Sequence, residues 1–317
     1  MSGVFGRVIG ANDTGGTKHL LYSDWHCSVF MNQEGVYVFC DSAKFLLSCE
    51  PRQFCSNTSH LFILSKSGNI LSFSKSQHLI TAANTPPFRS IAATDDELYC
   101  ISADEFLSVY SLNDFPNNLN TNRPLSMKIK SVACGCIQQG NRHVGHGDLE
   151  TRTSPELIAA LTPVTVTAIA CGSWHSVCLT DTGDIYTWGS NEFGQLGCPS
   201  LNLERSRNLN APLFSSDACV NLSALPVPVD LPEDVSVVAI ACGSRHTACL
   251  SEHKQLLTFG WNGFGQLGFD AELQKMPGRY PHQGASDKVN RTSLPFPSQS
   301  ELSLSCGSWC TIVRAME

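Results

Sequence analysis

An internal repeat constrains the fold of this chain more than any other feature. Residues 169–179 read IACGSWHSVCL and residues 240–250 read IACGSRHTACL, which are identical at eight of eleven positions and lie 71 residues apart. The similarity continues, because DIYTWGSNEFGQLG at 184–197 corresponds to QLLTFGWNGFGQLG at 255–268. Long units with alternating apolar residues are typical of β-propeller blades and not of helical solenoids.

Weaker copies of the repeat define one anchor position in each of seven units. These anchors are Ser23, Asn57, Thr94, Gly135, Gly172, Gly243 and Gly307. Seven units leave about 45 residues for each, enough for four short strands and their turns. A sheet with two apolar faces cannot bury both alone, so each sheet should pack against its neighbours. The sequence therefore predicts an all-β, seven-bladed β-propeller.

The repeats also predict where this propeller begins, closes and is interrupted. We expect a single propeller domain over 1–317, with its clearest repeats at 166–197 and 237–268. The last blade should be shared, with inner strands at about 302–315 and an outer strand at about 3–10, because closure removes free sheet edges.

The fourth blade should be incomplete, either as a genuine feature of the protein or because the sequence is a splice variant or an imperfect gene model. Gly172 and Gly197 are 25 positions apart, whereas Gly135 and Gly145 are only 10 apart, so about 15 positions of a strand pair are missing.

Recurring residues within the units are expected to be structural. Glycine should allow close backbone approach and tight turns. His26, His60, His175 and His246 recur at one position and should form hydrogen bonds between strands, since separate blades would keep them from converging on one site. The predicted structural repeat residues are Gly172, His175, Trp188, Gly194, Gly197, Gly243, His246, Gly260, Gly265 and Gly268.

Composition argues against several classes of function. The 28 acidic and 21 basic residues give a net charge of −7, which disfavours sequence-specific binding of nucleic acid. The start of the chain has no secretory pattern, and no apolar run is long enough to cross a membrane. The 15 cysteines form no compact disulfide pattern. We therefore expect a protein of the nucleus and/or the cytoplasm that is not secreted and does not bind membranes.

No enzyme motif is recognisable, so we expect neither catalytic residues nor a cofactor. The chain has no phosphate-binding GxxxxGK[ST] and no GxSxG elbow. Cys134, Cys171, Cys242 and Cys306 each precede an anchor glycine, where a small apolar side chain fits well. Cys134 and Cys136 have no second ligand pair at zinc-like spacing, so no metal site is expected.

Two insertions are the best candidates for a binding surface. Segments 198–234 and 269–300 follow the same FGQLG element and should leave the same edge of the propeller as loops. Loops on a rigid scaffold often carry binding residues, although a solvated linker is an equally good interpretation. The predicted partner-binding residues are Arg205, Arg207, Phe214, Arg279, Tyr280 and His282.

The ACGxxH and WGxNxxGQLG elements resemble those of the regulator of chromosome condensation repeat family of seven-bladed propellers. GHGDLETRTSPELIAAL at 145–161 is further similar to its short, single-propeller "regulator of chromosome condensation domain-containing" subfamily. The resemblance implies a non-catalytic interaction module with a chromatin-linked role, partnering a Jumonji-type oxygenase in histone methylation control and chromosome segregation. The alternative it implies is guanine-nucleotide exchange on a Ran-like small GTPase, which the acidic charge and the lack of a basic tail disfavour.

Overall fold

The computed structural model describes most of the chain. The described residues are 2–6, 19–24, 26–40, 43–83, 85–112, 128–134, 145–148, 150, 156–207, 219–268, 285–294, 296–297 and 299–316. They belong to two compact units, which are treated separately below. Unit 1 comprises Met1–Arg7 and Ile137–Glu317, and unit 2 comprises Val8–Cys136.

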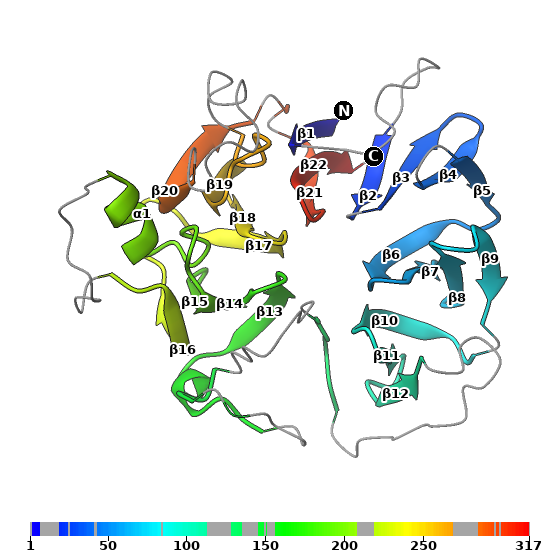
Figure 1. Ribbon diagram of the computed structural model, residues 1–317, viewed down its shortest axis with the longest axis horizontal. Coiled ribbons are helices and arrows are strands. Elements are labelled where there is room, and N and C mark those ends of the chain that lie inside the picture. The colour runs from blue at the N-terminus through cyan, green and yellow to red at the C-terminus, as the bar shows by residue number, and fades with distance from the viewer. Residues whose placement is uncertain are drawn as a thin grey trace. The chain divides into compact units, whose positions relative to one another are not determined.

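Unit 1 contains three antiparallel sheets (Figure 1). The first sheet has β13 (Val166–Cys171), β14 (His175–Thr180), β15 (Ile185–Ser190) and β16 (Leu222–Pro228). The second has β17 (Val237–Cys242), β18 (His246–Ser251), β19 (Gln255–Gly260) and β20 (Ser286–Ser293). The third has β21 (Glu301–Cys306), β22 (Cys310–Met316) and β1 (Ser2–Gly6). The short helices η1 (Ala159–Leu161) and α1 (Leu201–Arg207) lie outside the sheets.

Unit 2 also contains three antiparallel sheets, each following chain order. The first has β2 (His19–Ser23), β3 (Cys27–Asn32), β4 (Gly35–Cys40) and β5 (Ala43–Leu47). The second has β6 (Pro51–Ser56), β7 (His60–Ser65), β8 (Ile70–Ser74) and β9 (Leu79–Ala82). The third has β10 (Phe88–Ala93), β11 (Glu97–Ser102) and β12 (Leu107–Ser111). None of the described helices of either unit is long and apolar enough to cross a lipid bilayer.

The alternation of side chains along each second strand explains why the sheets stack. In β7, Leu61 and Ile63 pack in the hydrophobic core between the first and second sheets of unit 2. The intervening Phe62 and Leu64 pack in the core between the second and third sheets. Successive side chains of a strand point to opposite faces, so an apolar strand holds two neighbours at once.

The same arrangement orders the sheets of unit 1. Val177 and Leu179 of β14 pack with Val237 and Phe259 of the second sheet, and all four side chains are buried. On the other face of that second sheet, Ala248 packs with Val313 of β22. Each sheet therefore packs on the next as propeller blades do.

The third sheet of unit 1 joins the two ends of the described chain. β1 pairs with β22 from Ser2 opposite Arg314 to Gly6 opposite Cys310, and β22 also pairs with β21. This is the pairing of terminal strands that the sequence predicted for the last blade.

We expect deletion of residues 1–6 to lower the melting temperature of unit 1 by about 10 °C, because β22 would lose the strand that pairs with it from Cys310 to Arg314. Differential scanning calorimetry of the deletion variant, with removal of Met1 alone as the control, measures the effect. An unchanged transition would show that β1 contributes little to the stability of the sheet.

Two sequence expectations change at the level of the sheets. The described residues form six sheets, so a seventh blade is not seen in them, and most of the predicted fourth blade lies outside them. The insertions 198–234 and 269–300 are not entirely loops, because they contain α1 with β16 and β20 respectively. The outer strands lack the repeat's signature letters, since Pro226 and Pro228 interrupt the pattern in β16.

Candidate functional site

Neighbouring sheets of unit 1 are joined by a buried histidine–threonine hydrogen bond. His175 Nε2 lies 2.8 Å from Thr247 Oγ1 of the next sheet, and the Thr247 hydroxyl donates to the Gln195 carbonyl oxygen at 2.9 Å. A carbonyl cannot donate, so Thr247 must accept from the ring, and His175 must carry its proton on Nε2. We call this set of three residues the first latch.

A second latch repeats the same geometry one sheet further on. His246 Nε2 lies 3.1 Å from Thr311 Oγ1, and Thr311 donates to the Gln266 carbonyl oxygen at 2.8 Å. Both histidine rings are buried, and burial lowers their pKa to about 3, so both are neutral at physiological pH. The latches thus hold the sheets together without charge.

Glycine is required beneath each latch. A Cβ on Gly172 would collide with the Gly243 carbonyl oxygen of the next sheet and with the ring of His175. A Cβ on Gly243 would collide with the His246 ring and approach the Gly307 carbonyl oxygen to 2.8 Å. The GxxH spacing therefore encodes a close approach between blades as well as a turn.

Burial also accounts for the cysteines that precede these glycines. It raises the pKa of Cys171, Cys242 and Cys306, so their thiols stay protonated. Within the part of the chain that the structure describes, no group of three or more His, Cys, Asp or Glu side chains is placed to hold a metal ion.

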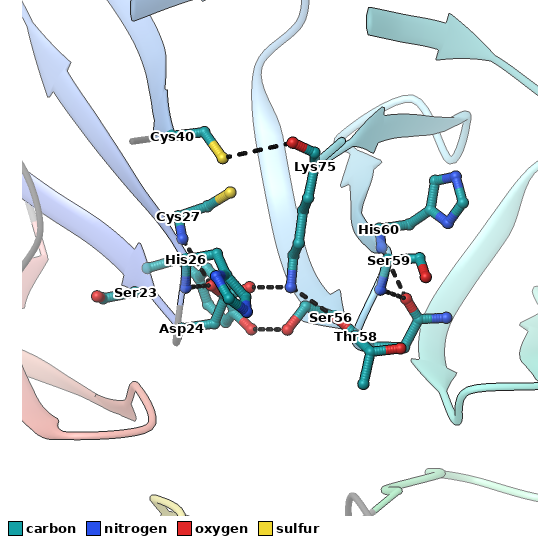
Figure 2. Close-up of polar contacts among 12 residues, drawn as sticks. Ser23, Asp24, His26, Cys27, Cys40, Ser56, Thr58, Ser59, His60 and Lys75 are labelled. Carbon is teal, nitrogen blue, oxygen red and sulfur yellow. Dashed lines mark hydrogen bonds and ion pairs between the residues drawn. The ribbon is translucent and has the colours of Figure 1, made fainter. Parts of the chain in front are cut away.

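Unit 2 joins its first two sheets by an ion pair instead (Figure 2). Lys75 Nζ lies 2.9 Å from Asp24 Oδ2 and donates to the Asn57 carbonyl oxygen at 2.6 Å. The Asp24 Oδ1 atom accepts from the backbone N–H groups of His26 and Cys27, both at 2.7 Å. Only 8% of the Lys75 side chain and 3% of the Asp24 side chain are exposed, so the pair is buried between two sheets.

This geometry corrects the predicted alignment of the first unit. In the turn after β13, the Gly172 N–H donates to the carbonyl oxygen of His175, three residues later. In the turn after β2, the corresponding hydrogen bond runs from the Asp24 N–H to the Cys27 carbonyl oxygen, so Asp24 and not Ser23 is equivalent to Gly172. Cys27 therefore occupies the latch histidine position, and His26 lies exposed one residue before it. The two sequences nevertheless align without a gap, because the turn between β3 and β4 is shorter than the turn between β14 and β15 and compensates for the one-residue shift at the start of the hairpin.

The second and third sheets of unit 2 are joined by amide and carboxylate contacts. The Gln53 side chain donates to the Ile91 carbonyl oxygen at 2.8 Å and accepts from the Ile91 N–H at 3.1 Å. The Thr58 backbone N–H and hydroxyl both donate to Asp95 Oδ1, at 3.0 and 2.9 Å. His60 occupies the latch histidine position in the second sheet, where the Asn57 N–H donates to its carbonyl oxygen, and these amide and carboxylate contacts join that sheet to the third.

Large aromatic side chains gather where the latch loops of unit 1 meet the loops after its third strands. The Trp261 and Trp309 ring centroids are 4.9 Å apart, and Phe264 lies 5.2 Å from Trp261 and 6.0 Å from Trp309. The three rings meet edge to face, at interplanar angles of 71–85°. All three are half-buried, so each also presents surface to solvent.

A cation takes the equivalent place one sheet earlier. The guanidinium carbon of Arg245 lies 4.6 Å from the centroid of the buried Phe193 ring, a cation–π contact. Burial lowers the pKa of Arg245 and neighbouring Glu192 opposes that shift, so the guanidinium stays charged. Trp174 occupies the same loop position in the first sheet and is half-buried. We call Trp174, Phe193, Arg245, Trp261, Phe264 and Trp309 the loop-end row.

The predicted partner-binding residues are only partly described. Arg205 lies half-buried on α1, whose first turn is capped by the Ser200 hydroxyl accepting from the Leu203 N–H at 3.4 Å. The backbone of Arg207 ends the same helix. Phe214, Arg279, Tyr280 and His282 lie outside the described residues. The structure therefore brings none of these six residues together as a described site.

Sequence reasoning missed the loop-end row, although a signal was present. The residue before the latch position is Trp174, Arg245 or Trp309, so the repeat varies there, whereas the serine that precedes it is constant. The two clearest repeats also carry a phenylalanine in FGQLG. A variable position beside constant structural residues is where a repeat can acquire its own binding specificity.

Family comparison decides the origin of the latch motifs. Models described as "Regulator of chromosome condensation (RCC1) repeat" match residues 138–179 and 182–250, and, for a second model, 166–195 and 237–266. Residues 138–179 and 182–250 match RCC1 repeats. The matched segments contain both latch histidines, so the resemblance drawn from the ACGxxH elements is confirmed. The antiparallel sheets of the structure agree with an all-β fold of the β-propeller type.

The chain spans about half the length of the curated relatives it matches. It is 33% identical over 200 residues to RCC1 domain-containing protein 1 of Homo sapiens, covering 56% of this chain and 50% of that protein. The Arabidopsis thaliana ultraviolet-B receptor UVR8 is 34% identical over 162 residues, covering 50% of this chain and 32% of the receptor.

One solved RCC1-type structure supports the fold alone. Prp20p from Saccharomyces cerevisiae superposes with a TM-score of 0.50 at 15% identity, covering 93% of this chain and 67% of that protein. Its structure was described together with its binding to Gsp1p and histones.

Proposed function

We propose that this chain is a non-catalytic protein-interaction module that binds its partner through the loop-end row. The observation that carries the proposal is the presentation of Trp, Arg and Phe side chains by loops that the latches hold in place. Tryptophan and arginine are the residues most enriched at interaction hot spots. Rigid loops also lose little conformational entropy on binding.

We further propose a nuclear, chromatin-linked role in partnership with a Jumonji-type oxygenase, acting in histone methylation control and chromosome segregation. The similarity to RCC1 domain-containing protein 1 supports a protein-interaction role, and the histone binding described for Prp20p motivates the proposed link to chromatin. The net charge of −7 favours contact with a protein over sequence-specific binding of DNA.

The second candidate is guanine-nucleotide exchange on a Ran-like small GTPase. It is favoured by the binding of Prp20p to Gsp1p. Purified chain should therefore be tested side by side for capture of a purified Jumonji-type oxygenase and for release of labelled GDP from a purified Ran-type GTPase. Capture without accelerated release supports the first function, and accelerated release supports the second.

We expect Arg245→Ala to weaken binding of the partner at least tenfold, because it removes a half-buried cation held on Phe193 at the centre of the row. Surface plasmon resonance with the immobilised partner measures the affinity. Arg291→Ala is the matched control, since it removes an arginine that pairs with Asp234 at 2.8 Å away from the row. Equal losses in the two variants would contradict the assignment of the row as the binding surface.

A further inference from the structure

The first sheet of unit 2 carries two cysteines at the positions that hold a histidine and a glycine in unit 1. His175 of β14 stands opposite Gly189 of β15, where a Cβ would lie 2.8 Å from the His175 Cα. The second latch repeats this histidine–glycine pair. In the first sheet of unit 2 the same two positions hold Cys27 of β3 and Cys40 of β4. Both members of the pair thus differ from the repeat, and both carry a thiol.

Cys27 and Cys40 stand opposite each other at a non-hydrogen-bonded position of the antiparallel ladder. The Cys27 carbonyl oxygen accepts from the Asp24 N–H at 2.8 Å, and the Cys27 N–H donates to Asp24 Oδ1 at 2.7 Å. Both backbone groups of Cys27 therefore point away from β4. Residues paired in this way have Cα atoms about 4.5 Å apart, and their side chains are closer than at hydrogen-bonded positions. A disulfide spans Cα separations of about 4.4–6.8 Å, so the pair has the geometry of a cross-strand disulfide.

The two thiols face each other inside unit 2. They are in hydrogen-bond contact, and both lie in the core between the first and second sheets, where they are 0% and 1% exposed. Figure 2 shows both sulfur atoms beside Lys75, whose carbonyl oxygen lies 4.0 Å from Cys40 Sγ. Among the paired strands that the structure describes, no other two cysteines stand directly opposite each other.

We propose that Cys27 and Cys40 are a site of reversible oxidation, at which a small peroxide converts the facing thiols to a disulfide while the sheet stays folded. The sulfur of one cysteine attacks an oxygen atom of hydrogen peroxide, which forms a sulfenic acid and releases water. The sulfur of the other cysteine then displaces the hydroxyl group, so that the S–S bond forms and a second water leaves. The two thiols are oxidised, the peroxide is reduced to water, and a thiol reductant reverses the reaction.

The surroundings of the pair determine which oxidant it accepts and what the reaction changes. Burial and the Asp24 carboxylate raise the pKa of Cys27, and the Lys75 ammonium opposes that shift. The protonated, buried pair should therefore react slowly, and with a small uncharged oxidant in preference to a bulky disulfide. Closure removes the thiol hydrogen of Cys40 beside the backbone of Lys75, the residue whose ammonium joins the first two sheets of unit 2. The site belongs to unit 2 and does not depend on the function proposed for the loop-end row.

Peptide mapping of the full chain tests the proposal. Trypsin cuts after Lys18 and Lys44 and releases residues 19–44, in which Cys27 and Cys40 are the only cysteines. The reduced chain is treated with hydrogen peroxide, its remaining thiols are blocked with iodoacetamide in denaturant, and the digest is analysed by mass spectrometry. We expect this peptide to lose two hydrogen atoms and to take up no iodoacetamide, and dithiothreitol should restore both thiols. Uptake of iodoacetamide at both positions after the treatment would overturn the proposal.

Two comparisons separate the folded geometry from chance pairing. In urea the 15 cysteines of the chain are free to pair with one another, so the bond between positions 27 and 40 should form at least about fivefold less than in the folded chain. Cys100 is the matched position in the folded chain, because it is buried on β11 opposite Ala92 and Ser108 and should remain a thiol. Equal yields of the bond in folded and urea-unfolded chain would refute the site.

Urea unfolding of the oxidised chain tests how well the bond fits the sheet. Closure between positions 27 and 40 should raise the unfolding midpoint of unit 2, because the cross-link restricts the unfolded chain. Cys40→Ser should unfold at the same urea concentration before and after the peroxide treatment, and Cys27→Ser serves if that variant does not fold. A lower midpoint after closure would show that the disulfide strains the sheet, which contradicts the geometry from which the site is inferred.

Discussion

Replacing Asp24 with asparagine should lower the free energy of unfolding of unit 2 by about 3 kcal/mol, because it leaves the Lys75 ammonium buried without its carboxylate. Asparagine keeps a side-chain oxygen that can accept the hydrogen bonds that the His26 and Cys27 backbone N–H groups donate to Asp24 Oδ1. The substitution therefore removes the charge and retains the turn. Denaturant unfolding followed by fluorescence measures the difference.

Two comparisons make this prediction specific to a buried pair. Lys66→Met removes the ion pair of Lys66 with Glu50, whose side chains are 71% and 77% exposed, and should change stability by less than about 1 kcal/mol. Asp24→Asn combined with Lys75→Met should recover part of the loss, because no unpaired charge remains. A loss at Asp24 no larger than that at Lys66 would show that water reaches the pair.

The repeat in the sequence predicted the blade-type sheets because its residues are tied to geometry. Gly172 and His175 recur at Gly243 and His246 because the close approach and the Nε2 hydrogen bond tolerate few alternatives. Alternating apolar positions such as those of β7 identified strands with two buried faces even where the signature letters are lost. Local rules of this kind can be read directly from a sequence.

The buried ion pair between Asp24 and Lys75 of unit 2 could not be predicted in the same way. Asp24 and Lys75 are 51 positions apart in different sheets, and neither residue type recurs in the repeat. The outer strands β16 and β20 were missed because each follows a long insertion and pairs on one side only. Each outer strand contacts the preceding strand on one side only, so few of its side chains are constrained and its sequence shows little of the repeat pattern.

The loop-end row shows the same division between local and long-range information. Its cation–π contact joins Phe193 and Arg245 across two sheets, and its aromatic cluster joins Trp261 with Trp309. Each contact forms only because the latches bring consecutive blades to a fixed separation. The sequence identified the latch histidines and the glycines beneath them, whereas their threonine partners and the surface they support required the structure.

Unit 1 should lose stability in mild acid through its two latch histidines. In the folded state burial lowers the pKa of His175 and His246 to about 3, whereas an unfolded histidine titrates near about 6.5. Between these two pKa values the unfolded chain binds protons that the folded latches do not bind. The contribution of the latches to the free energy of unfolding is therefore fully present above a pH of about 6.5 and is lost progressively as the pH falls toward about 3. The expected slope is about 1.4 kcal/mol per pH unit for each histidine.

The His246→Gln variant tests this origin, because glutamine keeps a side-chain N–H to donate to Thr311 but cannot be protonated in this range. Its unfolding free energy at pH 6, 5 and 4 should decline less steeply than that of the natural chain, by about 1.4 kcal/mol per pH unit. Carboxylates titrate in both chains, so the difference between the two slopes isolates the latch. His253→Gln, at a side chain that is 62% exposed, should keep the original slope. Equal slopes in all three chains would contradict the prediction. They would mean that the His246 ring is protonated in the folded protein and that the second latch tolerates its charge.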